Sequence, residues 1–74
     1  MGTNGSINFG DRLTHWREFR SLTMTQLAKA SGVSRTAIWK LETERSRPLL
    51  DTIYSLADAL SIPVEFLTKR GDTI

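Results

Sequence analysis

Residues 22–43 read LTMTQLAKASGVSRTAIWKLET, and the fold can be worked out from this stretch. Thr23 is followed three residues later by Gln26, which is the spacing at which a hydroxyl and an amide side chain cap the first turn of a helix reciprocally. This pattern predicts a helix that begins at Thr23 and carries Met24 and Leu27 on an apolar face.

The end of this helix and the start of the next are marked within the same stretch. Gly32 suits the left-handed conformation that ends many helices, and Ser34 is a good N-cap for a following helix. We expect that following helix over residues 34–43. Two short helices joined by a turn of three or four residues that contains glycine form a helix-turn-helix.

The second helix of this motif has an unusual solvent-facing side. At about 100° per residue, Ala37, Ile38 and Leu41 fall on one side of the helix. The other side carries two bases, two hydroxyls and an indole: Arg35, Thr36, Trp39, Lys40 and Thr43. Such a face suits the major groove of DNA, where cationic side chains bond guanine and threonine contacts the methyl group of thymine.

Three further helices are predicted around the motif. Asn8 caps a first helix that runs to about Arg20, a fourth helix covers about 50–60, and Pro63 begins a fifth over about 64–68. The apolar positions of the first are Phe9, Leu13, Trp16 and Phe19. The predicted core stripe of the fourth is Leu50, Ile53, Tyr54, Ala57 and Leu60. The predicted fold is an all-α, compact five-helix domain.

Length and composition limit what such a domain can do. The 74 residues suffice for one domain, expected over residues 8–68, with 69–74 frayed and 1–7 either a flexible start or a remnant of cloning. There is no cysteine and the one histidine is His15, so disulfides, thiol catalysis and zinc–thiolate sites are excluded. We therefore expect no metal and no cofactor.

Enzymatic and membrane functions find no support in the sequence. It has no glycine-rich phosphate loop, no nucleophile elbow and no paired carboxylates in an apolar setting, so we expect that the protein is not an enzyme. No apolar run approaches the roughly 20 residues of a membrane span. Without a recognisable signal peptide, a cytoplasmic protein is expected.

Charge is unevenly distributed along the chain. The whole sequence carries +2, but residues 12–47 hold eight basic and three acidic side chains, a net of +5. Residues 48–67 hold three acidic side chains and no basic one, a net of −3. The first segment suits a polyanionic partner. Chance segregation of charges on a solvated surface is the alternative explanation.

Several short motifs follow one another in a fixed order along the chain. They are Leu22–Ala28, Gly32–Ile38, Leu41–Glu42, Pro48 with Leu50, and Leu56–Leu60 followed by Ile62 and Leu67. This series resembles the lambda-repressor-like (Cro/CI, or XRE) helix-turn-helix family over residues 9–67. The resemblance implies a small bacterial or phage-encoded transcriptional regulator, expected to be a repressor, that binds double-stranded DNA. We expect a symmetric homodimer on a pseudo-palindromic operator, with half-sites ~34 Å apart.

The resemblance also implies roles for particular residues. The helix over 34–43 is implied to be the recognition helix in the major groove. The base contacts expected from it are Arg35, Thr36, Trp39 and Lys40. The expected phosphate contacts are Thr23, Thr25, Ser34, Thr43, Arg45 and Arg47. A structural ion pair is implied between Arg17 and Glu42. A dimer surface is expected around Ile62, Val64 and Phe66, and a place in the core is an equal alternative for Phe66.

Four positions depart from the pattern of the family. Met24 stands where glutamine commonly contacts phosphate, so that contact is missing or supplied by a neighbour such as Thr25. Glu44 stands where glycine often follows the recognition helix, and Leu49 where a serine or threonine often caps the fourth helix. Trp39 is large where the family has a small or polar residue.

Trp39 leaves two functions open. Its indole can stack on the sugar–phosphate chain or on thymine methyls, fold back over the seam between the first and third helices, or contact a partner protein. The alternative function is accordingly a protein-interaction module of the same fold, such as an antitoxin-type or anti-repressor-binding partner. A DNA-binding face loses affinity steeply with salt, whereas an apolar protein contact does not.

Overall fold

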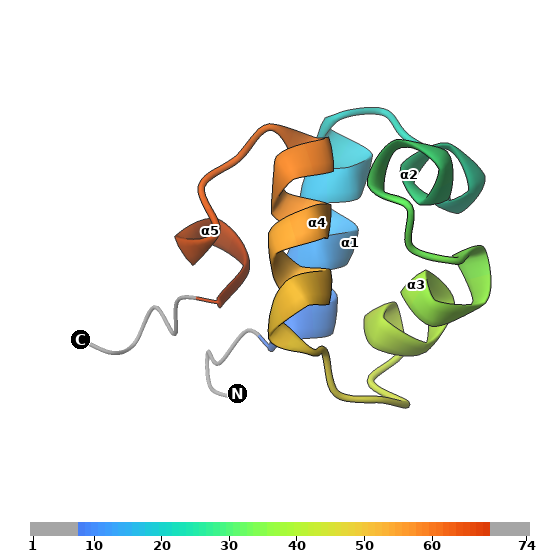
Figure 1. The fold of residues 1–74 in the computed structure, drawn as a ribbon, viewed down its shortest axis with the longest axis vertical. Helices are drawn as coiled ribbons and strands as arrows, with labels where there is room; N and C mark the ends of the chain where they lie inside the picture. The colour runs from blue at the N-terminus through green and yellow to red at the C-terminus, as the bar shows by residue number, and fades with distance from the viewer. Residues whose placement is uncertain (1–7, 69–74) are drawn as a thin grey trace.

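The computed structural model describes residues 8–68, which form five helices (Figure 1). These helices are α1 (Phe9–Phe19), α2 (Met24–Ser31), α3 (Arg35–Glu42), α4 (Leu50–Leu60) and α5 (Glu65–Thr68). The expectations for residues 1–7 and 69–74 lie outside the described residues. The first four helices begin and end within a residue or two of the predicted positions, and the all-α prediction is confirmed.

The N-terminal caps explain where the first three helices begin. Asn8 and Ser34 each accept the backbone N–H of the residue three positions on, at 2.9 and 3.0 Å. Thr23 and Gln26 form both hydrogen bonds of the predicted capping box, at 3.0 and 2.8 Å. Leu49, which precedes α4, makes no side-chain cap, as its apolar side chain requires. These caps satisfy N–H groups that have no partner within the helix.

Left-handed residues end α1 to α4. Gly32 ends α2 with φ 79°, but Ser21, Glu44 and Ser61 follow the other three helices with φ 59°, 61° and 58°. After α3, the N–H of Arg45 donates to the carbonyl of Lys40 at 2.7 Å, which closes a Schellman motif around Glu44. A left-handed conformation costs a non-glycine residue about 1–2 kcal/mol, so these three turns store strain.

The core is entirely apolar and draws on every helix. Its buried members are Leu13, Leu27, Ile38, Leu41, Ile53, Leu56, Ala57, Leu60 and Leu67. α1 packs against α3 and α5, while α2 packs against α3 and α4. In Figure 1, α2 and α3 lie on one side of the two longer helices and α5 lies on the other. The two helices of the motif are therefore supported by different neighbours.

Two residues of the predicted core stripe of α4 are not in the core. Leu50 and Tyr54 were expected in the core stripe of α4 but are exposed, because the inward face of this helix is taken by other residues, including Leu56. Phe19, at the last turn of α1, is 64% exposed. α5 begins at Glu65, one residue later than predicted. A helical wheel identifies apolar positions, but it does not show which of them another helix covers.

A polar network joins α1 to the end of α3. Glu42 accepts hydrogen bonds from Nε and a terminal nitrogen of Arg17, at 2.6 and 3.1 Å, and from the Thr14 hydroxyl at 3.0 Å. The side chain of Glu42 is only 4% exposed, so this is a nearly buried ion pair. Its hydrogen bond to Glu42 raises the pKa of Arg17 above its ordinary value. The Arg17 guanidinium therefore stays protonated at physiological pH, and as the pH rises its contribution to stability persists until extreme alkalinity.

A second contact between α1 and the segment at the end of α3 lies at the start of α1. The Glu44 carboxylate accepts the N–H of Gly10 at 2.6 Å. This N–H belongs to the first turn of α1, where the helix dipole favours a negative charge. Added to Gly10, a Cβ atom would lie 2.6 Å from the carbonyl oxygen of Leu41 and 2.8 Å from that of Glu42. Glycine is therefore required at position 10 for α1 to approach α3 this closely.

Glycine substitutions at two of the left-handed turns should differ in their effect on stability. Ser61→Gly should raise the free energy of unfolding by about 0.5–1 kcal/mol, because it removes backbone strain and, within residues 8–68, no side-chain hydrogen bond. Glu44→Gly should give no gain, since it also removes the charge-assisted bond to Gly10, of about 1.5–3 kcal/mol. Urea denaturation, monitored by circular dichroism, measures the free energy of unfolding of both variants. Equal stabilisation by both would show that the Glu44 carboxylate contributes nothing.

Candidate nucleic-acid interface

The residues expected to contact bases share one exposed face of α3. Arg35, Thr36 and Lys40 are exposed, and Trp39 is 41% exposed, while the opposite side of the helix is buried in the core. Within residues 8–68, the side chains of Arg35 and Lys40 take part in no hydrogen bond and no ion pair. Two cations held in solvent by a rigid helix can meet an anionic surface without first breaking internal bonds.

The hydroxyl groups expected at phosphates are mostly engaged in the helices themselves. Thr23 and Ser34 accept backbone N–H groups as N-caps. The Thr43 hydroxyl donates to the Trp39 carbonyl at 2.7 Å. Thr25 is exposed beside these caps, whereas Met24 is half-buried and packs on the core. Met24 therefore replaces a polar contact of the family pattern with an apolar one inside the domain.

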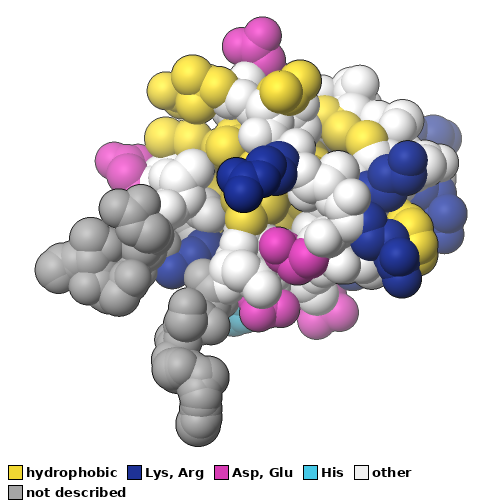
Figure 2. Space-filling view, turned by 90° about the horizontal axis from the view of Figure 1, so that it is seen from below, with side chains coloured by type: hydrophobic (Ala, Val, Ile, Leu, Met, Phe, Trp, Pro, Cys, Tyr) yellow, Lys and Arg dark blue, Asp and Glu magenta, His cyan; other side chains and the backbone are white. Residues whose placement is uncertain are grey.

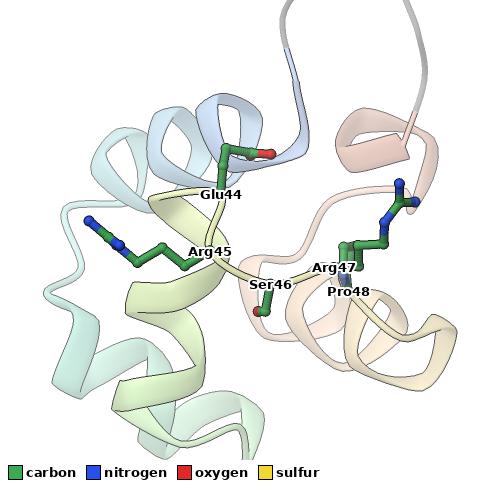
Figure 3. A pocket seen from close by; sticks show the side chains of 5 residues that line it. All are labelled: Glu44, Arg45, Ser46, Arg47 and Pro48. Atoms are coloured by element: carbon green, nitrogen blue, oxygen red, sulfur yellow. The ribbon is translucent and has the colours of Figure 1, made fainter.

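The loop after α3 surrounds an open depression. Figure 3 shows its lining, which consists of Glu44, Arg45, Ser46, Arg47 and Pro48. The Glu44 side chain points towards α1, and the two arginines point in opposite directions. Arg45 extends towards α3, where its guanidinium carbon lies 5.2 Å from the centre of the Trp39 ring. Arg47 extends over the α4 side, so the two expected phosphate contacts do not converge on one point.

Positive charge gathers on the side of the motif. Figure 2 shows lysine and arginine side chains around a hydrophobic group at the edge where α2 and α3 lie, and the acidic groups of this view are spread over the rest. Not all eight cations of residues 12–47 contribute to this patch, because two of them have structural partners within the domain. One is Arg17, paired with Glu42.

The other is Arg20, whose role the sequence analysis missed. Its Nε donates to the carbonyl of Leu60 at 2.8 Å and a terminal nitrogen donates to that of Ser61 at 3.1 Å. A cation at the C-terminal end of α4 satisfies carbonyls that lack partners within the helix and complements the helix dipole. Nothing in the local sequence signals this contact, because the partners are 40 and 41 residues apart.

The expected dimer surface is partly used within the domain. Ile62 and Val64 are half-buried against the core. Phe66 is exposed at one edge, and its ring centre lies 5.2 Å from that of Trp16. The structure thus leaves less apolar surface at this end than the sequence suggested, because α5 folds back onto α1.

The part of the chain that the structure describes contains neither a metal-binding cluster nor a membrane-spanning helix. It holds no group of three or more histidine, aspartate or glutamate side chains placed to bind a metal ion. None of its helices has the length and apolar character needed to span a membrane. The candidate site is the exposed face of α3 with the adjoining loop.

An all-α domain in which α2, a short turn and α3 carry an exposed basic face is a helix-turn-helix domain. Residues 15–67 match the sequence model of the helix-turn-helix family, and the chain belongs to this family. The resemblance found in the sequence is confirmed.

Curated relatives and solved structures agree with this assignment. The chain is 48% identical over 68 residues to the HTH-type transcriptional repressor RghR of Bacillus subtilis, covering 90% of this chain and 50% of that protein. It is 38% identical over 68 residues to the immunity repressor protein of Bacillus phage phi105, covering 92% and 47%. The chain therefore spans about half the length of the curated relatives it matches.

A solved structure of similar size supports the fold. The restriction-modification controller protein C.AhdI from Aeromonas hydrophila superposes with a TM-score of 0.79 at 33% identity, covering 82% of this chain and 92% of that one. An HTH_3 family transcriptional regulator from Vibrio cholerae superposes with a TM-score of 0.78, and its 24% identity supports the fold alone.

Proposed function

We propose that this chain binds double-stranded DNA as a transcriptional regulator, with α3 in the major groove. The observation that carries the proposal is the exposed face of Arg35, Thr36, Trp39 and Lys40, on which the cations have no bonding partner among the described residues. Residues near the start of a recognition helix contact base edges. Arg35 is the first residue of α3, and its guanidinium can bond O6 and N7 of guanine together.

Phosphate contacts would hold α3 in register. Thr25, Arg45 and Arg47 are exposed around it, and the starts of α2 and α3 present backbone N–H groups whose helix dipoles favour phosphate. Thr23, Ser34 and Thr43 belong to the proposed contact set through their positions at the helix ends, although their hydroxyl groups already have partners.

A symmetric dimer on a pseudo-palindromic operator, in the cytoplasm of a bacterium, completes the proposal. One α3 helix contacts too few bases for strong specificity, and two-fold pairing doubles the number. Phe66, with the half-buried Ile62 and Val64, is one part of the proposed contact between the copies. Repression is favoured by the names of the relatives, RghR and the phi105 immunity repressor.

The test is selection from a pool of randomised duplexes, followed by sequencing, at low and moderate salt. The expected result is an enriched motif with two-fold symmetry. Arg35→Ala should weaken binding to it by about 1–3 kcal/mol and relax the preference at one position of each half-site. Arg35→Lys is the matched control, since it keeps the charge and loses the paired hydrogen bonds.

Two results would contradict the proposal. If no sequence is enriched and affinity varies little with salt, α3 does not bind DNA, and the partly exposed Trp39 favours the protein-interaction alternative. If neither variant relaxes the preference at any position of the motif, and Arg35→Ala weakens binding to every sequence alike while Arg35→Lys retains it, Arg35 contacts phosphate and not a base.

A further inference from the structure

We propose that Trp39 is a positioning residue, whose indole holds Arg45 beside α3 so that Arg45 bonds a DNA phosphate at that edge of the interface. This inference rests on the proposed function and assigns a role to the residue that the sequence left open. The supporting contact is a cation–π interaction, in which the Arg45 guanidinium carbon lies over the Trp39 ring, 5.2 Å from its centre. At this distance the ring quadrupole attracts the cation.

The backbone brings the two side chains together. Arg45 lies beyond the end of α3, yet its N–H donates to the carbonyl of Lys40 at 2.7 Å. The left-handed turn at Glu44 makes this bond possible, and the Glu44 carboxylate fixes the turn to α1 through Gly10. The chain therefore turns at Glu44, and the Arg45 side chain extends beside the end of α3 (Figure 3), within reach of the Trp39 ring.

The contact with Trp39 leaves the hydrogen-bonding groups of Arg45 available. Among the described residues, the Arg45 side chain donates no hydrogen bond, so its N–H groups can bond an anion. Phosphate suits them, because arginine can bind it with two parallel hydrogen bonds. Trp39 also restricts the rotamers of Arg45 before binding, so less side-chain entropy is lost when the phosphate is bound.

The position of the pair favours phosphate over base. Base edges are contacted from the N-terminal part of a recognition helix, and Arg45 follows the C-terminal end of α3. Arg47 provides the internal comparison, because it lies in the same loop, carries the same charge and points the other way (Figure 3). Of the two loop arginines, Arg45 alone is stacked on an aromatic ring among the described residues.

The experiment measures the dependence of affinity on salt for one fixed duplex of mixed sequence. Each phosphate neutralised contributes about 0.9 to the slope of log affinity against log salt. Arg45→Ala should lower the slope by about that amount. Trp39→Ala removes no charge, yet it should lower the slope by a similar amount, and Trp39→Phe should restore most of it. The double variant should lose no more than Arg45→Ala alone.

Two controls keep the outcomes distinct. Arg47→Ala should lower the slope equally in the presence and absence of Trp39, and thermal melting followed by circular dichroism verifies that each variant is folded. An unchanged slope in folded Trp39→Ala, with weaker binding at every salt concentration, would mean that the indole contacts DNA directly and would overturn the inference. A wild-type protein with no salt dependence would instead refute the proposed function itself.

Discussion

Replacing Glu42 with alanine is expected to lower the free energy of unfolding by about 3–5 kcal/mol. The substitution removes three hydrogen bonds and leaves Arg17, itself only 12% exposed, without its counter-charge. A domain of 74 residues has a total stability of about 4–11 kcal/mol, so much of the protein should unfold on mild heating. Urea denaturation monitored by circular dichroism measures the loss.

Glu18 provides the matched control for this prediction. Its carboxylate also faces Arg17, at 3.9 Å, but the side chain is 68% exposed. Glu18→Ala should therefore cost no more than about 0.5 kcal/mol. Replacing both members of the buried pair, as Arg17→Met with Glu42→Leu, should cost less than Glu42→Ala alone, because no unpaired charge is left. Equal stability of Glu18→Ala and Glu42→Ala would rule out a structural role for the pair.

Gly10→Ala is expected to lower the free energy of unfolding by about 2–3 kcal/mol. The new methyl group would lie 2.6 and 2.8 Å from two backbone carbonyl oxygens at the end of α3, and would also collide with the Glu44 carboxylate. A side chain can move away, but the carbonyls are fixed by the helix. α1 must therefore move away from α3, and this weakens the packing between the two helices.

A second glycine separates crowding from backbone strain. Gly32 has a left-handed φ of 79°, and a Cβ atom there would meet nothing within 4 Å. Gly32→Ala should therefore cost only the conformational term of about 1–2 kcal/mol. Helix propensity alone gives the opposite expectation at position 10, a gain of up to about 1 kcal/mol. A stabilised Gly10→Ala variant would refute the close approach of α1 and α3.

The parts of the fold that could be predicted from the sequence are those set by short-range contacts. Asn8, Thr23 and Ser34 bond the N–H three residues on, so their identity and spacing determine where the helices begin. Burial was predicted less well, as Leu50 and Tyr54 show. Whether an apolar side chain is covered depends on the packing of other helices, and a single helical wheel contains no such information.

The features of the candidate site were also predicted only in part. The exposed face of α3 follows from its own periodicity, and the pair Arg17–Glu42 came from the family resemblance. Neither source indicated that Glu44 bonds Gly10 or that Arg45 stacks on Trp39. Both contacts depend on a left-handed glutamate, a conformation that the residue type argues against.

The separation of the exposed and buried sides of α3 bears on how such a protein changes over generations. Arg35, Thr36 and Lys40 have no bonding partner for their side chains among the described residues, so exchanging them should alter stability by no more than about 0.5 kcal/mol. A duplicated gene is then free to acquire a new target by drifting at these positions, while Gly10 and Glu42 stay constrained. The constrained residues of the scaffold determine which variants still fold, and the exposed residues of α3 determine which target a variant binds.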